Sequence, residues 1–237
     1  MIRQFRIRQI RTIGGASAPA SRGTAIAAFV AIFGLFSSAA LAHPHVLITA
    51  HTEIQLNGQG QLLSITNIWD FDEAFSAFAI QGYDSNGDGI LTRQELQPLA
   101  GVNMTSLADY GYFTSAILAG AKAAFGHPEN YFDIFKNEKL TLQFTLPLTK
   151  PLDVRGEAVE VDVYDPAYFA AITFAQDQPV RLLGDSAGCQ SFVHRPAPLD
   201  PNIASQLATI PASQRTPPPE LFAITNKLIN AVTVTCK

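Results

Sequence analysis

Residues 84–95 leave this chain the fewest choices of local structure; they read Asp-Ser-Asn-Gly-Asp-Gly-Ile-Leu-Thr-Arg-Gln-Glu. Oxygen-bearing side chains recur at the first, third, fifth, ninth and twelfth positions, and a glycine stands at the sixth. This is the pattern of a calcium loop between two helices, where the sixth residue turns too sharply for a Cβ atom. The expected ligands are the side chains of five residues and the carbonyl of Ile90: Asp84, Asn86, Asp88, Ile90, Thr92 and Glu95.

A second interpretation of the same stretch needs no metal. Thr92 and Glu95 have the spacing of a capping box, in which each side chain bonds the other's backbone at a helix start. We expect the capping box to coexist with the calcium site as the first turn of the exit helix. The sequence has no second such loop, which favours a structural site over a switch. Sites of this kind outside the cytoplasm bind calcium at about 0.1–1 mM.

Helical spacing of apolar residues surrounds the loop. Phe71, Phe75 and Phe78 recur on one face and predict an entering helix at 72–81. We expect the exit helix to be short, because Pro98 cannot continue it. A further helical stretch is predicted at 99–124, so that 71–127 would form a helical insert.

The first 42 residues have the organisation of a secretory signal. Five arginines and no acid precede or flank a short apolar core at 24–36, and Ala40-Leu41-Ala42 is typical of a cleavage site. We predict removal of residues 1–42 by the general secretory route, giving a periplasmic or secreted protein that is not itself embedded in the membrane. An uncleaved amino-terminal anchor is the alternative.

The charge of the predicted mature chain excludes some partners. Of the 16 Lys and Arg residues, 5 lie in the signal, and all 20 acidic residues lie after it. The predicted mature chain therefore has 11 basic and 20 acidic residues and a net charge of −9 with His neutral. An acidic surface without a basic stripe disfavours nucleic acid and is compatible with cations.

Cleavage after Ala42 would expose His43-Pro44-His45 as the new amino terminus. An amine and two imidazoles suit Zn, Cu, Ni or Co. A third ligand would have to come from the far end of a hairpin partner, where Asp70, Asp72 and Glu73 lie. The alternative is that the histidines are solvated and that the acids cap the entering helix. The candidate transition-metal residues are His43, His45, Asp72 and Glu73.

Alternating apolar residues predict strands in the rest of the chain. An opening β-hairpin at 43–70 contains strands at 46–56 and 61–69, with a turn at Asn57-Gly58-Gln59-Gly60. Further strands fill 128–194 and are predicted at 131–137, 140–148, 158–165, 170–174, 180–183 and 190–193. The expected fold is mainly β with an α insert: a β-sandwich of about eight strands interrupted by the calcium-binding helix–loop–helix segment.

Residues 195–237 form a proline-rich tail that we interpret as a linker, followed by a short helix at 220–230 and a terminal strand. Cys189 and Cys236 are the two cysteines of the chain. In an oxidising compartment they have one intramolecular pairing, which would tie the tail to the sandwich. Two free thiols that ligate a metal are the alternative.

Several motifs taken in order resemble a bacterial family. They are Ala-His-Pro-His-Val at 42–46, Trp-Asp-Phe-Asp-Glu at 69–73, the loop at 84–95, Tyr-Gly-Tyr-Phe at 110–113, Tyr-Asp-Pro at 164–166 and Val-Thr-Cys at 234–236. Together they resemble the domain-of-unknown-function family 1007 over the whole mature chain. The resemblance implies the periplasmic component of an uncharacterised ABC-type transport system, often found near nickel/cobalt-type permeases. On that resemblance, His43 and His45 fall on the family's His-Pro-His.

Three functions remain open at this point. The leading one is a secreted calcium-binding protein that handles a transition metal for a separate membrane permease. The second is a calcium-stabilised structural or protein-interaction module with no transport role. The third is an oxidative metalloenzyme with an amino-terminal His ligand. No nucleophile constellation or phosphate-binding loop is present in the sequence, and we do not expect an enzyme.

Overall fold

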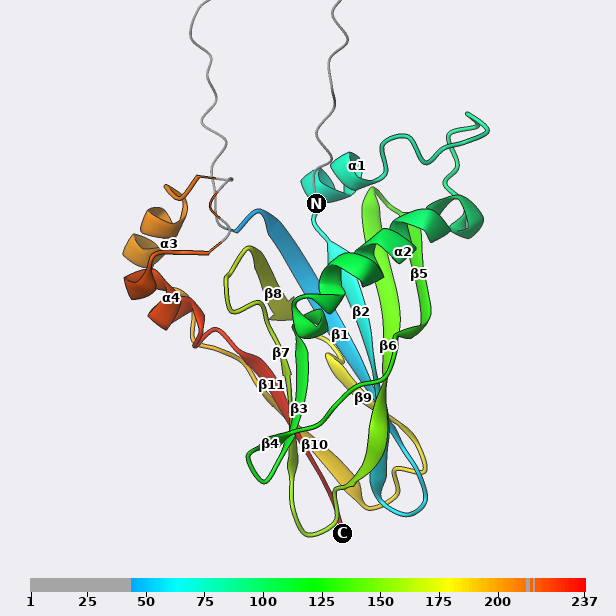
Figure 1. Cartoon of the computed structure of the whole chain (residues 1–237), viewed down its shortest axis with the longest axis vertical. Coiled ribbons are helices and arrows are strands. Elements are labelled where there is room, and N and C mark those ends of the chain that lie inside the picture. The colour runs from blue at the N-terminus through cyan, green and yellow to red at the C-terminus, as the bar shows by residue number, and fades with distance from the viewer. Residues whose placement is uncertain (1–43, 212–213, 215) are drawn as a thin grey trace, which may run out of the picture. The chain divides into compact units, whose positions relative to one another are not determined.

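The computed structural model describes residues 44–211, 214 and 216–237, so the predicted signal and His43 lie outside it. The described chain is mainly β, with eleven strands in two sheets, four α-helices and one 3-10 turn (Figure 1). This confirms the expected mixture of strands with helical segments, with more strands than the eight or so expected. No helix in this part of the chain has the length and apolar character that a membrane span requires.

The larger sheet has the order β5-β6-β2-β1-β8, and β9 also pairs with β1. Its strands are β1 (Val46–Leu56), β2 (Gln61–Phe71), β5 (Glu129–Lys136), β6 (Lys139–Asp153), β8 (Ala170–Phe174) and β9 (Val180–Gly184). The predicted hairpin is present: β1 and β2 are antiparallel, and Asn57 accepts hydrogen bonds from the N–H groups of Gln59 and Gln61 at the turn. Strands β8 and β9 run parallel to β1, one after the other along its length.

The smaller sheet has the order β10-β11-β7-β3-β4. Its strands are β3 (Thr114–Leu118), β4 (Ala121–Lys122), β7 (Val159–Val163), β10 (Cys189–His194) and β11 (Asn230–Cys236). The last of these in the sequence, β11, fills an interior position between β10 and β7.

Apolar side chains of both sheets join in two clusters. One cluster combines Ile54 and Ile65 of the larger sheet with Val161 and Val232 of the smaller one. The other is centred on Trp69 and is covered by helix α2 (Arg93–Ala108) through Leu96, Leu99, Ala100 and Met104. Burial of this face, at roughly 1.5–3 kcal/mol per large apolar side chain, holds α2 across β5.

Two predictions about the region of helix α2 are wrong. It runs for 16 residues through Pro98, whereas we expected the helix to stop there. Pro98 is exposed, so the backbone carbonyl that it leaves without a donor can bond water, and the buried face stabilises the helix on both sides. The helix then ends at Ala108, and the predicted helix at 99–124 is wrong beyond that point.

The segment after α2 becomes a 3-10 turn, η1 (Gly111–Phe113), followed by β3 and β4. In β3 the burial alternates, with Thr114 and Ala116 inside. The apolar residues of this segment therefore follow a period of two rather than the helical period that we read. The helical insert is accordingly limited to α1 (Glu73–Ala79), the loop and α2.

The proline-rich tail contains more structure than a linker. Helices α3 (Pro201–Leu207) and α4 (Pro219–Thr225) contribute Leu207 and Leu221 to a third, small apolar cluster (Figure 1). Helix α4 is shorter than the predicted 220–230, and α3 was not predicted. Its signal was present in Asp200, which caps the helix, and in the proline that follows at its first position.

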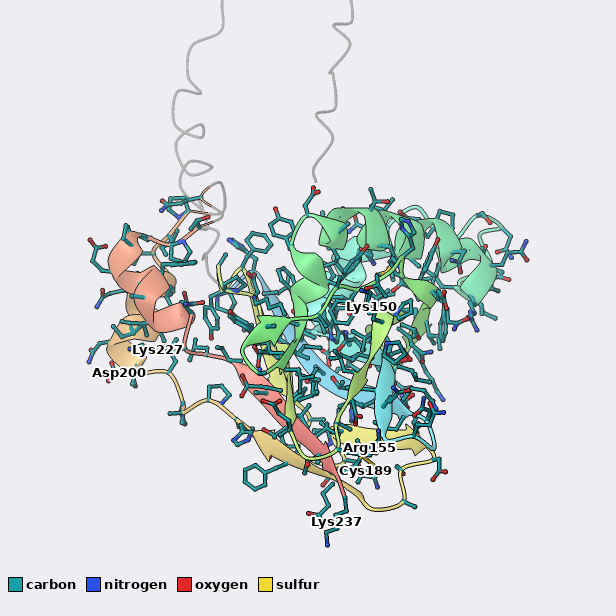
Figure 2. The ribbon with its side chains drawn as sticks, turned by 60° about the horizontal axis from the view of Figure 1, so that its bottom comes forward. Lys150, Arg155, Cys189, Asp200, Lys227 and Lys237 are labelled. Carbon is teal, nitrogen blue, oxygen red and sulfur yellow. A yellow bond between two sulfur atoms is a disulfide. The ribbon has the colours of Figure 1, made fainter. Side chains whose placement is uncertain are left out.

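Cys189 and Cys236 form the predicted disulfide, and neither thiol is free. They stand opposite each other in the β10–β11 pair, with their Cα atoms 3.9 Å apart. Cys189 and Lys237 mark this end of the sheet in Figure 2. The bridge closes a sequence separation of 47 residues, which in the chain-entropy treatment is worth about 4 kcal/mol.

Candidate metal centres

The loop at 84–95 connects α1 to α2 and is held by hydrogen bonds to its own backbone. The carboxylate of Asp84 accepts the N–H of Gly87 at 2.8 Å and the N–H of Gly89 at 2.9 Å. Gly89 has a φ of +78°, as the sixth position of a calcium loop requires. The first and sixth positions of the pattern are therefore bonded to each other.

The middle of the loop repeats this arrangement. Asn86 accepts the N–H of Asp88 at 2.9 Å, and Asp88 in turn accepts the N–H of Ile90 at 2.7 Å. The side-chain amide of Asn86 also donates to the second oxygen of Asp88 at 3.0 Å. The side chain of Ile90 is 66% exposed, whereas the next residue, Leu91, packs against the core beneath α2.

Glu95 closes the loop onto its own start. One carboxylate oxygen accepts from the N–H and the hydroxyl of Ser85, and the other accepts from the N–H and the hydroxyl of Thr92. The Thr92 hydroxyl also accepts the N–H of Glu95 at 3.3 Å, so the predicted capping box is present. The N–H of Thr92, then the hydroxyls of Ser85 and Thr92, lower the pKa of Glu95 to about 2. The carboxylate is therefore ionised at neutral pH.

The donor set suits a hard dication, but the acids are not gathered around one point. Across residues 44–211, 214 and 216–237, no three His, Cys, Asp or Glu side chains are grouped closely enough to hold a metal ion. Three of the six predicted ligands nevertheless share a hollow of about 640 Å³ beside the loop, lined in part by Asn86, Thr92 and Glu95. Calcium binding would require Glu95 to exchange its hydrogen bonds for the ion.

The structure tests the second predicted centre at only some of its residues. His43 lies outside the described residues. His45 is half-buried, its backbone N–H donates to the carbonyl of Phe169 at 2.8 Å, and its ring lies 4.6 Å from the Phe169 ring. The imidazole at this position is thus set against an aromatic ring at the start of β1.

Asp72 reaches the start of β1, as the hairpin predicted, but its oxygens bond backbone groups. One accepts the N–H of Phe75 at 2.9 Å as the N-cap of α1, and the other accepts the N–H of Leu47 at 2.9 Å. Glu73 is the exposed first residue of α1, and Asp70 accepts from the hydroxyl of Thr141. The helix-capping interpretation therefore describes Asp72, and the acids are not grouped with His45.

A buried carboxylate under α2 escaped the sequence analysis. Asp133 is fully buried in β5; one of its oxygens accepts the side-chain amide of Asn103 at 3.4 Å, and the other has no hydrogen-bond partner. Burial raises the pKa of Asp133 to about 7, against a smaller lowering by Asn103. Strand parity was the available signal, since Tyr131 and Phe135 share its inward face.

The comparisons with known proteins place the chain in a family without assigning a function. The chain is 28% identical over 187 residues to an uncharacterized protein of Haemophilus influenzae, covering 78% of this chain and 88% of that relative. It is 28% identical over 119 residues to an uncharacterized 15.5 kDa protein of Spirochaeta aurantia, covering 50% of this chain and 84% of that relative. Residues 28–236 match the family described as "Protein of unknown function (DUF1007)". Because this match covers most of the chain, the protein belongs to the DUF1007 family.

Proposed function

We propose that the protein is a secreted, calcium-binding accessory of a membrane transporter for a transition metal of the Ni, Co, Zn or Cu class. In this proposal calcium binds the loop at 84–95 and fixes α1 and α2 on a two-sheet β-sandwich. The amino-terminal segment holds the transition metal through His43 and His45 and passes it to a separate permease.

The observation that supports the calcium proposal is the residue pattern of the loop together with the hollow that three of its predicted ligands share. Asn86, Thr92 and Glu95 line one hollow, and Glu95 is ionised at neutral pH. Asp84 and Asp88 are fixed in place by backbone N–H groups, each of which leaves a lone pair for another contact. Calcium prefers carboxylate, amide, hydroxyl and carbonyl oxygens of this kind.

A melting experiment tests the calcium proposal. The melting temperature of the mature chain should rise as calcium increases through about 0.1–10 mM, and EGTA should reverse the rise. At about thirty times its dissociation constant a single ion adds about 2 kcal/mol to the free energy of unfolding.

Two variants and a control make that experiment specific. Glu95→Gln and Asp84→Asn should each remove the calcium response, because each deletes a charged ligand. The matched control Glu138→Gln changes an exposed acid outside the loop and should retain the response. A melting temperature that ignores both calcium and EGTA in the unmodified chain would falsify the calcium proposal.

The transition-metal part needs a separate measurement. Equilibrium dialysis against Zn, Ni, Co and Cu should show a site that the double variant His43→Ala/His45→Ala loses. His127→Ala, at a histidine far along the chain, is the control and should bind as the unmodified chain does. Equal metal affinities in all three proteins would refute the proposed transition-metal site at His43 and His45. That result would not affect the calcium proposal.

A second function is favoured by the hydrogen bonding of Asp72. Both of its oxygens are engaged by backbone N–H groups, and His45 contacts Phe169, so the predicted third ligand already has a structural role. We therefore also propose, as the alternative, a calcium-stabilised structural or protein-interaction module without a transport role. A partner captured by the unmodified chain and retained by the double His variant would favour this alternative.

A further inference from the structure

An aromatic hollow of about 410 Å³ is lined by η1, the start of β3, Lys122 of β4 and the segments that follow β4 and β7. Strands β7, β3 and β4 are neighbours in the smaller sheet (Figure 1). Its walls include five aromatic rings, from the turn η1, the segment after β4 and the end of β7: Tyr110, Tyr112, Phe113, Phe125 and Tyr164. Two of the motifs that carried the family resemblance, 110–113 and 164–166, meet in this hollow. Neither has a role in the calcium loop or at the amino terminus.

The turn that supplies most of these rings has an unfavourable backbone. Gly111, Tyr112 and Phe113 have φ values of +58°, +56° and +48° in succession. For the two aromatic residues this left-handed conformation costs roughly 1–2 kcal/mol each. Conformations of this kind persist only where the surrounding structure imposes them, and they occur often at ligand clamps.

A chain of buried hydrogen bonds imposes the conformation here. The hydroxyl of Thr114 donates to the carbonyl of Tyr112 at 2.9 Å, and the amide of Asn67 donates to that hydroxyl at 3.0 Å. Asn67 is fully buried in β2 and accepts in turn from the hydroxyl of Thr52 in β1. The interior of the larger sheet is therefore linked by hydrogen bonds to the backbone of η1 at Tyr112.

Acidic side chains lie behind one wall of the hollow, and Lys122 is part of its lining. Asp162 is 6% exposed and lies directly behind Ser115 of the wall, whose hydroxyl donates to one of its oxygens at 3.2 Å. Its other oxygen is buried and accepts no hydrogen bond. Glu160 stands two residues earlier on the same face of β7. Burial and then Glu160 raise the pKa of Asp162, whereas the Ser115 hydroxyl and the charge of Lys122 lower it. Two carboxylates thus face one ammonium group.

We propose that the aromatic hollow binds a small organic cation, an ammonium group carried on an apolar body. The faces of aromatic rings attract such a group, and the carboxyl of Asp162 lies behind the wall, bonded to Ser115. Burial raises the pKa of the Tyr112 and Tyr164 phenols, so their rings remain neutral. An inorganic cation would need a cage of oxygen ligands instead of rings.

The test compares choline with its neutral isostere 3,3-dimethyl-1-butanol, because the two share shape and differ in charge. Titration of the mature chain, followed by heteronuclear NMR, should show saturable binding of choline with shifts in the hollow. We expect choline to bind about tenfold more tightly than the isostere, in the range that cation–π contacts provide. The proposal fails if choline shows no saturable binding or binds no better than the isostere.

Three variants and a control identify the groups responsible. Asp162→Asn keeps the shape and should weaken choline alone, which removes most of the preference over the isostere. Tyr164→Leu deletes a ring and should do the same, whereas Tyr164→Phe keeps the ring and should bind choline normally. Asp177→Asn, at an exposed turn outside the hollow, is the control. Circular dichroism confirms that each variant is folded. Choline affinity that survives both Asp162→Asn and Tyr164→Leu places the cation elsewhere and overturns the proposal.

Discussion

Glu95 and Asp133 are two carboxylates that helix α2 places in opposite surroundings. Glu95, in the first turn of α2, is partly exposed to water and accepts four hydrogen bonds, and its pKa falls to about 2. Asp133 lies beneath the same helix, accepts one long hydrogen bond from Asn103, and its pKa rises to about 7. The comparison shows that hydrogen-bond donors dominate where water screens the charge, and that desolvation dominates where it does not.

The largest expected effect comes from the buried acid. Between pH 4 and pH 7 native Asp133 keeps a proton that the unfolded chain has released, so the free energy of unfolding falls as pH rises through this window. The fall is about 4 kcal/mol and levels off above pH 7. Urea unfolding at pH 4.5 and pH 8 measures it, and Asp133→Asn, which cannot ionise, supplies the reference. A pH profile that this variant leaves unchanged would contradict the assignment.

A second prediction concerns Asn103, whose side-chain amide donates the hydrogen bond to Asp133. Asn103→Leu deletes the hydrogen bond to the carboxylate, so the pKa of Asp133 should rise above 7. At pH 8 the variant should lose about 1–3 kcal/mol of unfolding free energy, because a buried acceptor loses its partner. At pH 4.5, where the acid is neutral, the loss should be smaller. Carbon-13 NMR titration of the Asp133 carboxyl measures the first effect and urea unfolding the second.

Thr92→Ala removes the hydroxyl that caps α2 and donates a hydrogen bond to Glu95. The free energy of unfolding should fall by about 1 kcal/mol, as is usual for a lost N-cap. The pKa of Glu95 should move up toward its ordinary value, because the Thr92 hydroxyl no longer donates to it. Thr105→Ala, at an exposed threonine within α2, is the control and should leave the pKa of Glu95 unchanged.

The smallest effect should follow from Ser85→Ala. The hydroxyl of Ser85 lowers the pKa of Glu95, so its loss should raise that pKa. The free energy of unfolding should change by less than about 0.5 kcal/mol, as is typical of exposed positions. A large destabilisation would mean that the hydrogen bond between Ser85 and Glu95 stabilises the fold more than the exposure of Ser85 indicates.

Features set by the local spacing of residues could be predicted from the sequence, and features set by distant segments could not. The capping box of Thr92 and Glu95 and the hairpin of β1 and β2 depend on local spacing, and the structure contains both as predicted. The segment at 84–95 connects α1 to α2, and its calcium site stays a prediction. The disulfide was predicted because two cysteines allow one pairing. The metal ligands themselves are not gathered in the structure, and they stay a prediction.

Features that depend on distant segments were missed. Asp133 is buried because α2, about thirty residues earlier, lies across it, and nothing in the local pattern of β5 shows that cover. The length of α2 beyond Pro98 likewise reflects packing on the larger sheet, which overrides the local preference of proline. The segment at 114–118 was read as helix because its apolar residues fit either period until Val161 and its neighbours on β7 select the strand.

The interior position of β11 has a consequence for biosynthesis. Strands β7 and β10 can each pair with β11 only after residues 230–236 have left the ribosome. Until then both strands expose unpaired backbone edges, which are templates for aggregation. A polypeptide shortened before residue 230 would keep those edges permanently, so the cell must protect the nascent chain until its closing strand arrives.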